Sequence, residues 1–80
     1  MTTNIANQPD IARAETEALA FQAAEDASAE RFEEVRLQLV AGNRAEEATR
    51  SPEFTEWMAA RARTDEAWGR WAMAMDAAHG

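Results

Sequence analysis

Residues 54–71 decide the fold, and they read Phe-Thr-Glu-Trp-Met-Ala-Ala-Arg-Ala-Arg-Thr-Asp-Glu-Ala-Trp-Gly-Arg-Trp. This stretch contains all three tryptophans, Trp57, Trp68 and Trp71, and one of the three phenylalanines. Each tryptophan can bury about 200 Å² of surface. In a chain of 80 residues, such side chains form either the centre of the core or the centre of a contact surface. We expect two tryptophans to lie in the core and the third to be available to a partner.

One helix-start signal precedes this stretch, and a second lies within it. Ser51-Pro52-Glu53 combines a capping hydroxyl, a proline at the first helical position and an acid in the first turn. Thr64 is a second capping hydroxyl, and Asp65 and Glu66 place two acids in the first turn that follows it. The sequence therefore predicts one helix over 52–62 and another over 65–78.

The N-terminal half is rich in alanine and predicts helix throughout. Residues 1–8 are polar and are expected to form a disordered tail, and Pro9 marks the first helical turn. Ser28 is the only break signal before residue 41, and the sequence leaves open whether residues 9–41 form one helix or two. The arrangement we expect has two helices, over 9–27 and 29–41.

A turn is predicted after residue 41. Gly42 can adopt the left-handed conformation that ends a helix, because it has no Cβ atom. Asn43 can then cap a short helix over 44–50, with Glu46 completing a capping box. This short helix and the helix over 52–62 are expected to form one bent pair.

These signals predict an all-α domain over residues 9–78, a small bundle of about four helices, with a short tail at 79–80. The chain has no cysteine, which excludes disulfides, and its single histidine, His79, cannot form a metal site without carboxylate ligands. No cofactor is expected. Only seventeen residues are Ile, Leu, Val, Phe, Trp or Met, so the core is thin and depends on tight helix packing or on a partner. The expected core consists of Phe32, Val35, Leu39, Phe54, Trp57, Trp68, Trp71 and Met75.

The net charge of −7 limits the choice of partner. Fifteen acids face eight bases, all arginine, so phosphate backbones and anionic lipid would repel the chain. A protein with a basic surface is the better expectation. The sequence shows neither a signal peptide nor an apolar run of membrane-spanning length, and a cytoplasmic location is expected.

Catalysis is not expected from these residues. Glu33/Glu34, Glu46/Glu47 and Asp65/Glu66 are neighbours in sequence, and on a helix they point about 100° apart rather than facing each other. No hydroxyl has an evident base beside it. The candidate functional residues are therefore partner contacts, namely Trp57, Met58, Arg61, Trp68, Arg70, Trp71 and Met73. Met73 is included because it falls outside the apolar stripe of the last predicted helix.

The aromatic spacing resembles a known family. Phe54, then Trp57-Met58-Ala59-Ala60, then Trp68 and Arg70, is similar to the F-x-x-W-L-A-A…A-W-x-R pattern in the N-terminal cytosolic domain of FecR-family anti-sigma regulators. Here Arg61-Ala62-Arg63-Thr64 replaces the family's D-P-x-H turn. The resemblance implies an all-helical module that binds an extracytoplasmic-function sigma factor and modulates transcription, with Trp57, Trp68 and Arg70 among its signature residues.

Two other hypotheses account for the same composition. A small acidic helical protein can act as an inhibitor that imitates nucleic acid, as phage anti-CRISPR proteins do, and so block a nucleic-acid-handling complex. It can also be a homo-oligomer whose tryptophan stripe is its own interface. Truncation of tryptophan or methionine should weaken a sigma-factor binder most, whereas neutralisation of carboxylates should weaken a nucleic-acid mimic most.

Overall fold

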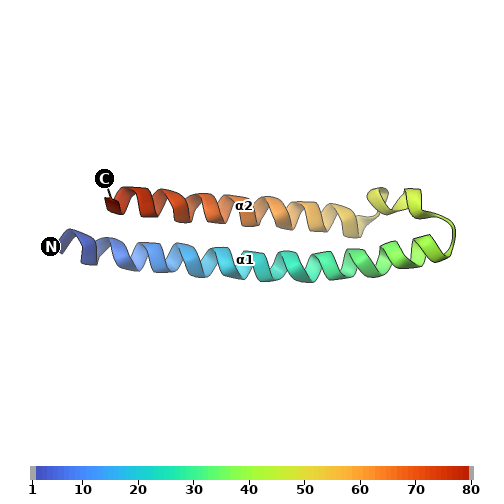
Figure 1. The fold of residues 1–80 in the computed structure, drawn as a ribbon, viewed down its shortest axis with the longest axis horizontal. Helices are drawn as coiled ribbons and strands as arrows, with labels where there is room; N and C mark the ends of the chain where they lie inside the picture. Colours follow the sequence, from blue (N-terminus) through green and yellow to red (C-terminus); the bar gives the residue numbers. More distant parts are fainter. Residues whose placement is uncertain (1, 80) are drawn as a thin grey trace.

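The chain forms a long helical hairpin. The computed structural model describes the backbone of residues 2–79 and the side chains of residues 10–79. Helix α1 spans Thr2–Ala41, the 3₁₀ helix η1 spans Ala45–Arg50, and helix α2 spans Pro52–His79. The two long helices run antiparallel, side by side (Figure 1). No strand occurs within residues 2–79, and the predicted all-α class is confirmed.

The expected bundle of about four helices is wrong, because both predicted breaks lie inside continuous helices. Ser28 is buried within α1, where its hydroxyl accepts a hydrogen bond from Nη2 of Arg31 at 3.0 Å. Thr64 is buried within α2, where its Oγ1 donates to the carbonyl oxygen of Ala60 at 3.1 Å. Each hydroxyl therefore finds its partner within its own helix, and each side chain is small enough to lie between the helices.

The two helices meet along a seam with a seven-residue repeat. Buried and half-buried side chains recur at alternating spacings of three and four residues, which is the pattern of helices that coil around each other. On α1 they are Ile11, Ala14, Ala18, Phe21, Glu25, Ser28, Phe32, Val35 and Leu39. On α2 they are Trp57, Ala60, Thr64, Ala67, Trp71, Ala74 and Ala78. One uninterrupted repeat on each helix explains why neither breaks.

The buried part of this seam consists almost entirely of small side chains. Three of its six residues are alanine, two are Ser28 and Thr64, and Phe32, 8% exposed, is its one large residue among those the structure describes. The seven other members of the expected core are only half-buried: Val35, Leu39, Phe54, Trp57, Trp68, Trp71 and Met75. Two helices alone provide no third layer to cover a large side chain from the outside.

The connection between the helices differs in detail from the prediction. Asn43, not Gly42, adopts the left-handed conformation, with φ of 65°. Arg44 is the residue that precedes η1, and its side chain makes no capping bond to the backbone, so the predicted capping box does not form. The start signal at Ser51 is confirmed, since its Oγ accepts a hydrogen bond from the backbone amide of Phe54 at 3.2 Å.

The hairpin is a thin rod of 62 × 16 × 13 Å, with a Cα radius of gyration of 17.9 Å. A compact domain of 80 residues would have a radius of gyration of about 12 Å. The expected tail at residues 1–8 falls where no side chains are described, although the helical backbone is drawn from Thr2, and it stays a prediction. At the other end α2 includes His79, and Gly80 lies outside the described residues.

Candidate protein-binding surface

Three aromatic rings pack together where α2 begins. The rings of Phe32 and Trp57 stack with centroids 5.2 Å apart and an interplanar angle of 21°. Phe54 lies 5.4 Å from Phe32 and 6.2 Å from Trp57. The guanidinium carbon of the exposed Arg61 lies 5.9 Å from the centre of the Trp57 ring, within cation–π range. Together these contacts fix α2 against α1 near the turn.

The other two tryptophans pair further along α2. Trp68 and Trp71 meet edge to face, with centroids 5.4 Å apart and an angle of 86° between the rings. The indole nitrogen of Trp68 donates to the side-chain oxygen of Gln22 on α1 at 3.2 Å. The indole nitrogen of Trp71 is buried without a hydrogen-bond partner among the described side chains. The tryptophans thus contribute to packing, while both indoles of this pair stay partly exposed.

One side of α2 carries a line of large side chains beside the seam. Phe54, Arg61, Trp68 and Met75 are spaced seven residues apart, so they point in nearly the same direction. Of these, Arg61 is exposed and the other three are half-buried. Met58 of α2, half-buried, and Gln22 of α1, which bonds to Trp68, lie on the same side. We call these six residues the aromatic face.

The predicted partner contacts divide between two sides of the hairpin. Met58, Arg61 and Trp68 belong to the aromatic face, and Trp57 and Trp71 lie in the adjoining seam. Arg70 lies on the other side of the seam, where its Nη2 pairs with Glu17 of α1 at 3.7 Å. Met73 also points away from the aromatic face and is 74% exposed. Because a helix turns about 100° per residue, positions 70 and 73 are separated from position 68 by more than a quarter turn.

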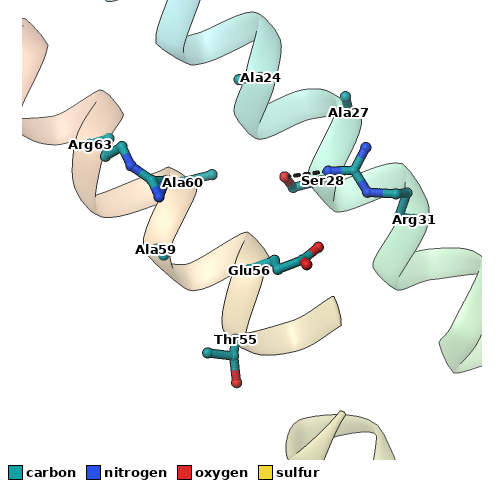
Figure 2. Close-up of a pocket in the computed structure, with 9 residues that line it drawn as sticks. All are labelled: Ala24, Ala27, Ser28, Arg31, Thr55, Glu56, Ala59, Ala60 and Arg63. Atoms are coloured by element: carbon teal, nitrogen blue, oxygen red, sulfur yellow. Dashed lines mark hydrogen bonds between the residues drawn. The ribbon is translucent and has the colours of Figure 1, made fainter. Parts of the chain in front are cut away.

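The opposite side of the hairpin is hollowed into a shallow groove of about 540 Å³. Figure 2 shows α1 and α2 bordering it, with the side chain of Ala60 pointing into the space between them and the Ser28–Arg31 hydrogen bond on the α1 wall. Charged side chains stand at the rim. The groove is lined by Ala24, Ala27, Ser28, Arg31, Thr55, Glu56, Ala59, Ala60 and Arg63. With four alanines among its nine lining residues, the groove gives a helix room to approach but offers no group of converging catalytic side chains.

Two local ion pairs on the surface shift the pKa values of their carboxyl groups. The hydrogen bonds from Arg36 lower the pKa of the Glu33 carboxyl, and those from Arg44 lower the pKa of the Glu47 carboxyl. The Nε atoms of the two arginines donate at 2.9 and 2.8 Å respectively. Both pairs join residues three apart on the exposed surface, so they are stabilising contacts of the helix type rather than an acid and base facing a substrate.

Neither a metal-binding cluster nor a membrane-spanning helix is found in the part of the chain that the structure describes. No three histidine or carboxylate side chains gather closely enough there to hold a metal ion. Neither long helix has an apolar segment of the length required to cross a bilayer.

Sequence reasoning missed three members of this surface. Gln22 was not considered, and Phe54 and Met75 were assigned only to the core. The seven-residue spacing of 54, 61, 68 and 75 was the signal that could have joined them, because it persists only if α2 continues through Thr64. The assumed break at Thr64 concealed it.

Comparisons of the chain with protein-family models, with curated proteins and with solved structures gave no match. Function is therefore argued from the hairpin and its two sides.

Proposed function

We propose that this chain is a non-enzymatic protein-binding module and that the aromatic face is its binding surface. One observation carries the proposal: Phe54, Met58, Trp68 and Met75 line one side of α2 and are only half-buried. Large aromatic and methionine side chains are enriched where proteins bind one another, and tryptophan contributes most per residue. A partner would cover the surface that α1 leaves open.

The state of the hydroxyl and imidazole groups favours a binding role over a catalytic one. Ser28 and Thr64 are engaged within their own helices, and Ser51 caps α2. A ring nitrogen of His79 lies 2.8 Å from the carbonyl oxygen of Met75 in the last turn of α2. A nucleophile needs a base within hydrogen-bond reach, and none of these groups has such a neighbour.

The charge of the chain favours a partner that is basic around an apolar centre. At −7, the hairpin would attract such a protein from a distance, while the aromatic face would supply most of the affinity. The resemblance described above makes the proposal specific: a cytoplasmic regulator that binds an extracytoplasmic-function sigma factor, a helical protein with basic DNA-binding surfaces.

Affinity capture from the native host tests this proposal with a matched pair of variants. Arg61→Glu alters the aromatic face, and Arg63→Glu makes the same change at the rim of the opposite groove. Both residues are exposed, and circular dichroism checks that each variant keeps its helices. We expect the native chain and Arg63→Glu to retain a sigma factor that Arg61→Glu loses.

Two results would overturn the proposal. Equal retention by both variants would remove the aromatic face as the binding surface. Recovery of a nucleic-acid-handling complex that moderate salt releases, and that tolerates Arg61→Glu, would support an acidic mimic instead.

A further inference from the structure

The described hairpin exposes more surface than a compact protein of its size. Its accessible surface is 5819 Å², whereas a compact monomer of 8.9 kDa exposes about 4,800 Å². The difference, about 1,000 Å², is close to the roughly 800 Å² that each partner buries in a standard protein interface. No large side chain in the described part of the chain is fully buried. These are the properties of half of a four-helix bundle.

The aromatic face is also complementary to itself. Its four evenly spaced α2 residues run Phe54, Arg61, Trp68, Met75. If two copies of α2 lie antiparallel around an axis between Thr64 and Asp65, position 61 of one copy meets position 68 of the other, and position 54 meets position 75. Each guanidinium then lies against an indole, and each thioether against a phenyl ring, which are both favourable pairs.

We propose that the partner bound at the aromatic face is a second copy of this chain, so that two hairpins form an antiparallel four-helix bundle with α2 against α2. The inference rests on the proposed function, since it takes the aromatic face as the binding surface. The contact is the same patch on both copies and therefore closes as a dimer. Its core, from position 54 to position 75, extends about 32 Å along α2.

This arrangement has a consequence for any other partner. The aromatic face would be occupied in the dimer, so a different protein would have to displace the second copy or bind at the alanine-lined groove on the opposite side. The effect of salt distinguishes dimer formation from binding to a basic protein. Two chains of −7 repel each other, so salt should strengthen the dimer, whereas it should weaken attraction to a basic protein.

Sedimentation equilibrium across a range of protein and salt concentrations tests the proposal. We expect a mass twice that of one chain, a dimer at least about tenfold weaker for Arg61→Glu, and no change for Arg63→Glu. A monomer at every concentration, or a dimer weakened only by Arg63→Glu, would overturn the inference.

Cross-linking tests the antiparallel register. The chain has no cysteine, so one can be introduced at a chosen position. Asp65→Cys lies beside the proposed axis, and a short bis-maleimide should join the two copies. Asp76→Cys should not react in this way, because its equivalent in the second copy lies about 34 Å away along the helix. Efficient cross-linking at position 76 and none at position 65 would exclude the register.

These experiments separate failure of the inference from failure of the proposed function. A monomeric chain whose Arg61→Glu variant loses a captured protein would reject the second copy and keep the aromatic face as a binding surface. A monomeric chain whose captured partners are insensitive to Arg61→Glu would reject both.

Discussion

Trp57 joins the two helices through its contacts with two phenylalanine rings. It stacks on Phe32, the one large buried residue of the described seam, and meets the edge of Phe54. Because it is half-buried, we expect Trp57→Ala to cost about 3 kcal/mol of unfolding free energy, at the low end for a large aromatic.

Urea denaturation measures this cost, and Trp57→Phe is the control, since it keeps an aromatic ring beside Phe32. We expect the phenylalanine variant to lose less than half as much stability. Equal stability of Trp57→Ala and the native chain would show that the cluster does not hold the helices together.

The Glu33–Arg36 ion pair should make the stability of the fold depend on pH. Its hydrogen bonds lower the pKa of the Glu33 carboxyl below 4.5, so the folded state holds that proton more weakly than the unfolded state does. The pair's stabilising contribution is therefore complete above about pH 4.5 and is lost as the pH falls through the lowered pKa. Glu33→Gln should therefore lower the melting temperature more at pH 7 than at pH 3.

Glu34→Gln, one position along and outside this pair, serves as the control. A melting-temperature difference between Glu33→Gln and the native chain that stayed the same from pH 7 to pH 3 would contradict the role of the pair. The contribution should also shrink as salt is added, because both side chains are on the surface.

Among the elements, the start of α2 depends on one hydroxyl. Ser51 Oγ accepts from the amide of Phe54 and donates to the carbonyl oxygen of Ala48 at 2.7 Å, so it links η1 to α2. Ser51→Ala should cost about 1 kcal/mol, as is typical of a lost helix cap. Chemical denaturation measures it beside Thr49→Ala, which changes an exposed neighbouring hydroxyl and should be nearly silent.

Gly69 is a position in the interior of α2 where a substitution should increase stability. A Cβ atom built on Gly69 meets nothing within 4 Å, and the residue has no positive φ. Gly69→Ala should therefore stabilise the protein by about 0.5 to 1 kcal/mol, since alanine loses less backbone freedom in a helix. A raised melting temperature is expected, and a lowered one would indicate that another backbone approaches this point.

The elements also show which sequence signals are dependable. The helix start at Ser51 and the end of the first long helix at residue 41 were predicted correctly, because the groups that decide them lie within a few residues. Ser28 and Thr64 carry the same local signals, yet the acceptors or donors that satisfy them lie inside the helix. What separates the two cases is burial, because Ser28 and Thr64 lie in the seam against the other helix, and local sequence patterns do not report that.

The candidate binding surface was also predicted only in part. The tryptophans were expected to divide between core and surface, and instead all three are half-buried. The sequence identifies which side chains are large. It does not show how many other helices will pack against these side chains, and that number decides how exposed they are.

The extended shape of the whole molecule can be measured in solution. As a rod, the hairpin has a Cα radius of gyration of 17.9 Å, whereas the small bundle expected from the sequence would measure about 12 Å. Because α2 lies alongside most of α1, pairing two copies through α2 thickens the rod without lengthening it much. Small-angle X-ray scattering should therefore give at least about 18 Å for monomer or dimer. A value near 12 Å would contradict the extended hairpin.

The antiparallel course of the two helices brings both ends of the described chain to the same end of the rod (Figure 1). A mechanical load applied to those two ends would act across the seam rather than along it. It would first separate the layer around Ile11 and Ala78 and then each layer in turn towards Asn43. Such loading breaks only a few contacts at a time, so the hairpin should open like a zipper at low force, and it should close again from the turn when the load is removed.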